Sequence, residues 1–220
     1  MKRTLIAAAL AIATLASVHA SAATITGLVN TGTGASGTQD TNYALTSNSS
    51  DTTIANSYGY VTGGSGFPFN YWTANTATSK WITPTLDQAQ TFDANANGTY
   101  TYELKFNLAG DVASSAAFTG QFSADNSAVV TLNGKAIGSS SGFTSWSSFA
   151  SSGATFNSGL NTLDFTVTNW AQNGGNPTGL RVEFTSSSVT AVPEPETYAM
   201  LLAGLGLVGF MARRRKAKQA

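Results

Sequence analysis

Cysteine is absent from the 220 residues of this chain, and histidine occurs once, at His19. Without cysteine the chain can form neither disulfides nor thiolate metal sites, and it has no thiol nucleophile. Since the only histidine lies among the first 22 residues, the remainder also lacks Ser-His-Asp catalysis and the usual zinc ligands. Carboxylates, lysines, tyrosines and hydroxyls are the groups left for any catalysis.

Charge is also scarce, at 10% of the residues, and it is unevenly placed. Residues 23–192 hold four cationic side chains against nine acidic ones, which leaves a net charge of −5. Most of the basic residues lie instead at the two ends of the chain. Nucleic-acid binding depends on neutralising phosphates with a basic patch, so this acidic segment predicts no nucleic-acid partner.

The first 22 residues have the order of a secretion signal. Lys2 and Arg3 precede an apolar stretch from Leu5 to Ala16, and small residues follow up to Ala20-Ser21-Ala22. A cationic start, an apolar centre and an Ala-x-Ala site are typical of a cleavable signal peptide. We therefore expect residues 1–22 to be a signal peptide cleaved after Ala22, with cleavage two residues earlier as the alternative.

The C-terminal segment, residues 192–220, begins with two prolines and ends in a basic cluster. Pro193 and Pro195 exclude a helix that continues from upstream. The apolar run 198–212 then covers 15 residues, about 22 Å as a helix, against roughly 30 Å for the hydrocarbon core of a bilayer. The basic residues at 213–218 predict that this end stays on the cytoplasmic side. We expect a short hydrophobic helix that acts as a transmembrane helix of marginal length.

This tail resembles the PEP-CTERM sorting signal of Gram-negative bacteria. The likeness rests on Val192-Pro193-Glu194-Pro195, on the glycine-bearing apolar run and on Arg213-Arg214-Arg215. The resemblance implies that an exosortase-type enzyme recognises the tail, cleaves near the Pro-Glu-Pro element and delivers the protein to the cell surface or extracellular matrix. A plain C-terminal membrane anchor without processing is the alternative.

Between the two ends, residues 23–191 predict one all-β domain. Residues 100–108 alternate apolar and polar side chains, as do 163–168 and 180–185, a pattern that leaves one strand face buried. Asn133-Gly134 between apolar segments is a strong hairpin signal. No stretch in this region has the 3.6-residue period of a helix, so we predict an antiparallel β-sandwich or jelly roll. The Ser-, Thr-, Gly- and Asn-rich residues 23–66 are expected to form short strands with long loops, with a flexible stalk as the alternative.

Several short segments occur in the order seen in bacterial galactose-binding-like jelly rolls. They span about residues 70–187 and comprise Ser79–Ile82, Thr99–Tyr102, Ala124–Ser127, Leu132–Gly134, Leu160–Asn169 and Asn176–Val182. On this basis the domain resembles a sandwich of the carbohydrate-binding-module type. The resemblance implies a fold first and a sugar ligand second, because a fold does not fix a function.

Sugar binding on such folds uses exposed aromatic rings that stack on pyranose faces, with amides around the rim. The carbohydrate-binding candidates are Trp72, Trp146, Trp170, Asn126, Asn169 and Asn176, with Asn173 as a further amide. Trp146 and Trp170 lie in segments typical of loops, where binding groups are commonly presented. The alternative is that these rings cover the ends of the sandwich, while Trp81 is expected in the core or at the rim of the fold.

Asp93, Asn95 and Asn97, followed by Gly98, match the first half of a calcium-binding loop. The second half fails, because the twelfth position is Leu104 where a glutamate is required. We expect a polar turn at this place. Calcium is kept as a candidate ligand, and no other cofactor is predicted.

A glycosidase needs two carboxylates about 5 to 9.5 Å apart. The available carboxylates are Asp125, Asp164, Glu103 and Glu183. Two of them, Glu103 and Glu183, alternate with Lys105 and Arg181, and we expect all four charges on a solvated sheet face. We therefore predict a non-enzymatic, exported cell-surface or matrix protein that binds exopolysaccharide. A structural or adhesive surface protein without a glycan ligand is the alternative, and a jelly-roll glycan hydrolase is the third candidate.

Overall fold

The computed structural model describes residues 22–55, 57–192 and 195–217. The expected signal peptide up to residue 21, together with Pro193 and Glu194 of the sorting element, lies outside the described residues. The chain separates into two compact units. One runs from Ala23 to Val189, and the second contains the single helix of the described part, α2 (Pro195–Ala217).

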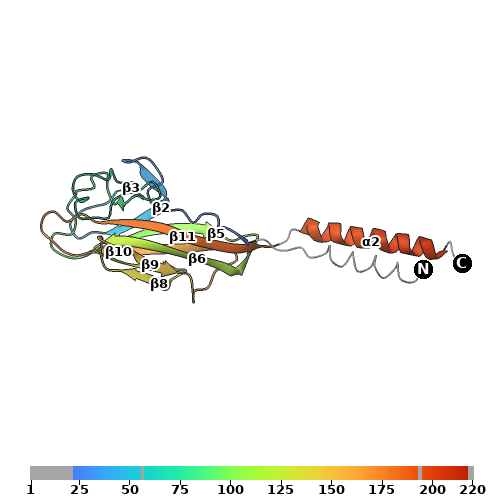
Figure 1. Ribbon diagram of the computed structural model, residues 1–220. Coiled ribbons are helices and arrows are strands. Elements are labelled where there is room, and N and C mark those ends of the chain that lie inside the picture. Colours follow the sequence, from blue (N-terminus) through green and yellow to red (C-terminus); the bar gives the residue numbers. More distant parts are fainter. Residues whose placement is uncertain (1–21, 56, 193–194, 218–220) are drawn as a thin grey trace. The chain divides into compact units, whose positions relative to one another are not determined.

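The strands pair in a mostly antiparallel, 11-stranded sheet, which confirms the predicted all-β class (Figure 1). They are β1 (Ala22–Ala23), β2 (Gln39–Asn48), β3 (Tyr58–Val61), β4 (Ile82–Thr83), β5 (Gly98–Asn107), β6 (Asp111–Asp125), β7 (Ser127–Leu132), β8 (Lys135–Ser140), β9 (Ser147–Ala150), β10 (Leu160–Asn169) and β11 (Gly179–Ala191). Their order is β8-β7-β10-β5-β2-β3-β4-β11-β6-β9, and β1 pairs with β11 off this path.

The sheet folds over on itself into a sandwich with an aromatic core. The ring centre of Phe165 on β10 lies 5.9 Å from that of Phe122 on β6 and 5.8 Å from that of Phe149 on β9. Phe106 on β5 meets Phe118 on β6 at 6.2 Å. All five rings are buried and meet edge to face, the geometry that the ring quadrupole favours.

The strands with a clear two-residue period form as predicted. On β5, Tyr100, Tyr102, Leu104 and Phe106 are buried while the intervening residues reach solvent. β7 and β8 form the predicted hairpin, with Leu132 opposite Lys135. Asn133 and Gly134 take φ values of 49° and 81°, the left-handed pair that a two-residue turn between twisted strands requires.

The strands described between residues 23 and 66, β2 and β3, belong to the sandwich and do not form a stalk. β2 pairs with β5 from Tyr43 opposite Leu104 to Asn48 opposite Thr99, which places it in the middle of the sheet order. Tyr43 is fully buried, and its hydroxyl donates to the carbonyl oxygen of Val29 at 2.5 Å. This segment thus contributes one strand of ten residues, β2, and one of four, β3, to the sheet.

The expectation of a solvated charge at Arg181 is wrong. Its side chain is only 2% exposed, whereas its neighbour Glu183 keeps 15% exposure. Two-residue alternation predicted a polar face at this position, but the long segment between β3 and β4 covers the start of β11 and buries the guanidinium. The other expected pair does stay at the surface, where Lys105 lies 2.6 Å from Glu103.

Helix α2 carries apolar side chains that are open to solvent. Met200, Leu202 and Leu207 are 75%, 68% and 63% exposed, and the guanidinium of Arg214 lies 5.6 Å from the ring centre of Phe210 one turn earlier. This is the short C-terminal helix that the sequence predicts. In the described part of the chain, no helix is both long and apolar enough to cross a membrane, so the expected transmembrane helix is not supported.

Candidate functional site

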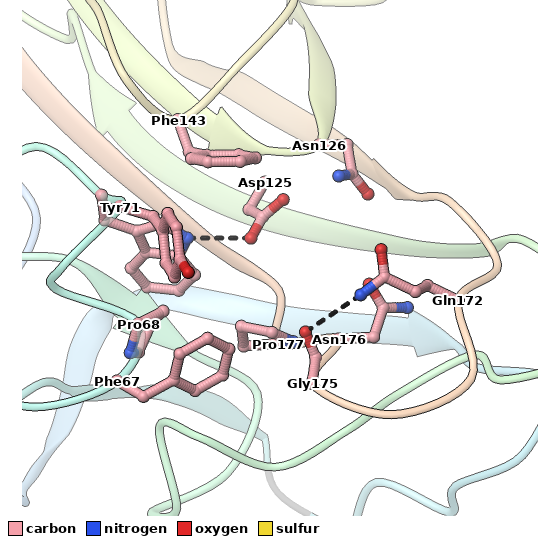
Figure 2. Close-up of a pocket in the computed structure, with 11 residues that line it drawn as sticks. Phe67, Pro68, Tyr71, Asp125, Asn126, Phe143, Gln172, Gly175, Asn176 and Pro177 are labelled. Carbon is pink, nitrogen blue, oxygen red and sulfur yellow. Dashed lines mark hydrogen bonds between the residues drawn. The ribbon is translucent and has the colours of Figure 1, made fainter.

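Four connections of the sandwich meet around an open pocket of about 250 Å³ (Figure 2). They are the β3–β4 segment, the junction of β6 and β7, the β8–β9 loop and the β10–β11 loop. The lining residues are Phe67, Pro68, Tyr71, Trp72, Asp125, Asn126, Phe143, Gln172, Gly175, Asn176 and Pro177. The pocket is therefore built on loops that the rigid strands position.

Aromatic side chains form one side of the pocket. Trp72 is buried, stacks on Trp81 with ring centres 4.3 Å apart, and donates from Nε1 to Oδ2 of Asp125 at 2.8 Å. Tyr71 and Phe67 are 61% and 38% exposed, and their rings meet edge to face at 6.2 Å. This side of the pocket thus combines a buried indole with two aromatic side chains that solvent can reach.

Local turns and one glycine fix this aromatic side. The backbone amides of Tyr71 and Trp72 both donate to the carbonyl oxygen of Pro68, at 2.8 and 3.0 Å. The Trp72 ring lies against Gly179 at the start of β11, where an added Cβ would stand 2.8 Å from Cη2 of the indole. Only glycine leaves room for the ring at this position.

Amide side chains face the aromatic residues across the pocket (Figure 2). Oδ1 of Asn126 accepts from the backbone amide of Trp170 at 2.7 Å. Nδ2 of Asn176 donates to the carbonyl oxygens of Phe92 and Trp170, at 2.7 and 2.9 Å. Nε2 of Gln172 donates to the carbonyl oxygens of Gly174 and Gly175 at 3.1 and 3.3 Å. These bonds hold the β10–β11 loop in place and orient each amide.

Asp125 and the three amide side chains of the pocket each keep one polar atom without a partner among the described residues. The atoms are Oδ1 of Asp125, Nδ2 of Asn126, Oε1 of Gln172 and Oδ1 of Asn176. None of these four is among the fully buried polar atoms that lack a partner in the described part of the chain, which are Tyr102 Oη and Asn169 Oδ1. The four pocket atoms are therefore open to a ligand.

Asp125 is the one carboxylate in the lining and is only 5% exposed. Burial raises the pKa of its carboxyl group from the ordinary 3.8 to about 7, and the hydrogen bond from Trp72 lowers it by a smaller amount. No charged group contributes to this pKa shift. Asp125 precedes a cis peptide bond to Asn126, and its carbonyl oxygen accepts from Thr178 Oγ1 at 2.7 Å.

Trp170 lies beside the pocket, outside the lining residues. Its side chain is 53% exposed, and its backbone amide and carbonyl are bonded by the side chains of Asn126 and Asn176. The indole is thus an exposed ring on an anchored backbone. Such a ring can stack on a ligand that extends past the pocket rim.

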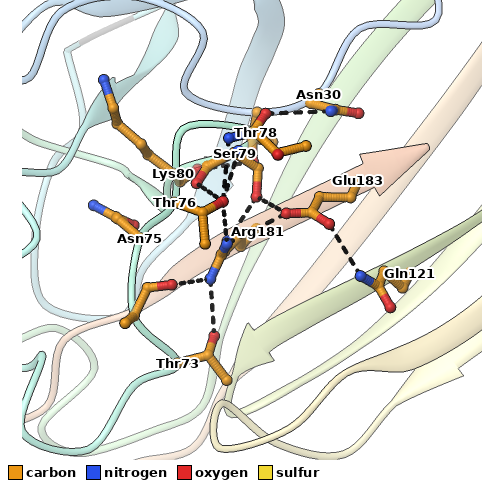
Figure 3. A network of polar contacts seen from close by, with 12 residues as sticks. Asn30, Thr73, Asn75, Thr76, Thr78, Ser79, Lys80, Gln121, Arg181 and Glu183 are labelled. Carbon is orange, nitrogen blue, oxygen red and sulfur yellow. Dashed lines mark hydrogen bonds and ion pairs between the residues drawn. The ribbon is translucent and has the colours of Figure 1, made fainter. Parts of the chain in front are cut away.

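Trp146 packs elsewhere, against the buried Arg181. Figure 3 shows the polar contacts of Arg181 with Ser79 and Thr76. The guanidinium lies 4.6 Å from the ring centre of Trp146 and donates to Ser79 Oγ at 2.7 Å, to Thr76 Oγ1 at 3.1 Å and to the carbonyl oxygen of Ala74. One face of Trp146 is therefore covered by a cation. Sugar binding by Trp146, and the alternative that this ring covers an end of the sandwich, both stay predictions.

Asn169 and the candidate calcium loop form a separate polar cluster. Asp93 is buried and both of its carboxylate oxygens accept bonds, from the Ser50 amide, the Tyr100 hydroxyl and Asn169 Nδ2. Nδ2 of Asn95 donates to Asp51, and Oδ1 of Asn97 accepts from the amide of Ala171. In the described residues no three His, Cys, Asp or Glu side chains gather at one point. Calcium binding here stays a prediction.

The structure brings three of the six carbohydrate-binding candidates, Trp72, Asn126 and Asn176, into one pocket and places Trp170 next to it. Trp146, Asn169 and Asn173 are not among the lining residues. Sequence reasoning missed Phe67, Tyr71, Phe143 and Gln172, and it weighed Asp125 only as an acid for hydrolysis. The aromatic cluster Gly66-Phe67-Pro68-Phe69-Asn70-Tyr71-Trp72 was a signal that could have identified the β3–β4 segment.

Comparison with solved structures finds remote likenesses to a carbohydrate binding module, a sugar-binding domain and a glycosidase. The chain is 14% identical to a family 35 carbohydrate binding module from an environmental isolate, covering 71% of this chain and 97% of that one with a TM-score of 0.32. It is 12% identical to the PA14 sugar-binding domain of an RTX adhesin, covering 70% and 100% with a TM-score of 0.29. A β-glucuronidase from an uncultured Clostridium species is 20% identical over 42% of this chain and 19% of that one, with a TM-score of 0.29. The chain thus spans about a fifth of that enzyme.

These likenesses are remote, so the ligand of this chain is inferred from the pocket alone. No curated protein matches the chain.

The tail is the part that a family model recognises. Residues 191–216 match the PEP-CTERM protein-sorting motif. Within it, Arg213, Arg214 and Arg215 are exposed at the end of α2. Residues 191–216 are therefore a PEP-CTERM sorting motif, and the protein is exported across the inner membrane and sorted by an exosortase to the cell surface or the extracellular space.

Proposed function

We propose that the sandwich binds exopolysaccharide noncovalently through the pocket between Tyr71 and Asn126, with Trp170 as a stacking surface beside it. The observation that carries the proposal is the combination of solvent-accessible aromatic rings with four open polar atoms in one pocket. Sugar rings offer an apolar face to aromatics and a rim of hydroxyls to amides. Concave sites with few oriented polar groups are the usual form of small-ligand sites.

Delivery to the surface supports the same ligand class. A protein sorted outside the inner membrane by its PEP-CTERM motif meets the polysaccharides that its own cell secretes. Loop aromatics are also rigid groups that gain contact area at little cost in conformational entropy. The protein would hold matrix chains near the cell.

We also propose that the pocket does no chemistry on the glycan. Glycoside hydrolysis uses two carboxylates that flank the bond. In the lining of this pocket Asp125 is the single carboxylate, and Trp72 already engages one of its oxygens. Turnover of a glycan by the purified protein, lost in Asp125→Asn, would contradict this part of the proposal.

The test is a pull-down of the full-length protein with exopolysaccharide from the source cell, kept in a detergent that carries no sugar. Tyr71→Ala and Trp170→Ala remove the two most exposed rings at the site, which contribute little to the core. Loss of one stacked ring should weaken binding by about fivefold, since such contacts are worth about 1 kcal/mol.

Leu160→Ala is the matched control, because this side chain is 55% exposed at the far end of β10 from Asn169. It should bind as the unaltered protein does. Absence of binding to every exopolysaccharide of the source cell would overturn the proposal and favour the structural or adhesive alternative.

A further inference from the structure

The charge of the pocket bears on which sugars it can take. Among the lining residues Asp125 is the only acidic side chain, and none is cationic. Tyr71 carries the only other titratable group in the lining. The one guanidinium of the sandwich, Arg181, is spent on Ser79, Thr76 and Glu183. A ligand carboxylate or sulfate would find no opposite charge here, and would lie close to a carboxylate in a partly desolvated site.

The open polar atoms of the pocket also favour a neutral ligand. Three of the four are acceptors, on Asp125, Gln172 and Asn176, and one is a donor, on Asn126. A sugar hydroxyl can donate to the acceptors and accept from Asn126, whereas a carboxylate or sulfate can only accept. An anionic group would therefore leave most of the pocket's acceptors without a donor. This is costly at Asp125 and Asn176, which are buried.

The size of the pocket limits how much of a chain can enter. Its volume of about 250 Å³ lies just below the range of roughly 300 to 1,000 Å³ that holds drug-sized ligands. One sugar ring fits such a space better than a longer segment does. The neighbouring Trp170, whose backbone is bonded to the pocket residues Asn126 and Asn176, is 53% exposed and offers a ring for a second unit.

We infer that the pocket selects neutral, hydroxyl-donating sugar units and discriminates against uronic-acid and sulfated units. This inference rests on the proposed function and names its ligand class. The matrix chain it recognises is thus a neutral polysaccharide, or the neutral branches of an acidic one. Asp125 is the residue that sets this selectivity.

The test compares methyl glycosides in matched pairs, glucoside with glucuronide and galactoside with galacturonide, by titration into the full-length protein at pH 8.5. Within a pair only the C6 group changes from hydroxymethyl to carboxylate. The better-bound neutral sugar should have an affinity about tenfold or more above that of its uronide. In Asp125→Asn, which keeps an oxygen for the Trp72 bond, the gap within that pair should shrink. Asp111→Asn, at the opposite end of β6, makes the same charge change away from the pocket and should leave the gap intact.

The possible failures are distinguishable. Equal or tighter binding of the uronides overturns the selectivity and leaves the proposed function standing. An unchanged gap in Asp125→Asn overturns the assignment to this carboxylate. If neither member of any pair binds, and the native exopolysaccharide is not retained either, the proposed function itself is overturned.

Discussion

Replacing Asp125 by Asn should stabilise the protein at alkaline pH. The carboxyl group is buried in the pocket wall, and burial raises its pKa from 3.8 to about 7. In the unfolded chain the same group titrates near its ordinary value. Between these two pH values the folded protein holds one proton more than the unfolded protein, so the free energy of unfolding falls as the pH rises.

The size of the effect follows from the two pKa values. Each unit of difference corresponds to about 1.4 kcal/mol, so the full difference is worth roughly 4 kcal/mol. The stabilisation is fully present below the pKa that Asp125 has in the unfolded chain. It declines between the two pKa values and is lost above about pH 7. Asn is neutral at every pH and can still accept the Trp72 bond, so the variant escapes this loss.

The measurement is chemical denaturation of the full-length protein and of Asp125→Asn from pH 4 to pH 8.5. Other carboxylates titrate in both proteins, so the difference between the two curves isolates Asp125. It should be small near pH 4 and grow to a few kcal/mol in favour of the variant by pH 8.5. Parallel curves would refute the reasoning, and Asp111→Asn serves as the control for loss of a charge on the same strand.

Three further substitutions test the packing and the tail. Arg181→Met should lower the unfolding free energy by about 3 kcal/mol, measured by denaturation, because it leaves Glu183 and the β3–β4 carbonyl without their cation. Gly179→Ala places a Cβ 2.8 Å from the Trp72 ring and should cost about 1 to 3 kcal/mol and weaken glycan binding, whereas unchanged stability would show that the ring can move. Replacing Arg213–Arg215 by Gln removes the basic end of the PEP-CTERM motif, and should reduce the fraction of protein reaching the surface in cell fractionation.

Local rules predicted the central strands well. Phe165 and Tyr102 follow strict two-residue alternation, and Asn133-Gly134 has the turn chemistry that its left-handed φ values require. Each of these features depends on residues adjacent in sequence. The sorting tail was likewise predictable, because its order of prolines, apolar run and arginines is linear.

The pocket depends on contacts between distant segments, and these were harder to predict. Trp72 meets Asp125 across 53 positions, and Arg181 meets Thr76 across 105. Alternation alone assigned Arg181 to solvent because nothing in β11 indicates that the β3–β4 segment covers it. Only half of the carbohydrate-binding candidates line the pocket. Tryptophan and asparagine in loops indicate a binding site by composition, but composition does not predict which loops meet.

Arg181 and Asp125, two of the buried ionisable side chains of the sandwich, differ in a way that separates structure from function. Arg181 donates from Nε, Nη1 and Nη2 to fixed protein oxygens, so the fold accounts for its burial. Asp125 lines the pocket without a cationic partner, and it accepts one bond, on Oδ2. A carboxylate buried in this state lowers the stability of the free protein above pH 7, and sites that break local rules without internal compensation are where function is expected. A surface protein with a purely structural role would have no need of such a group, whereas a site that receives hydroxyl donors from a sugar does.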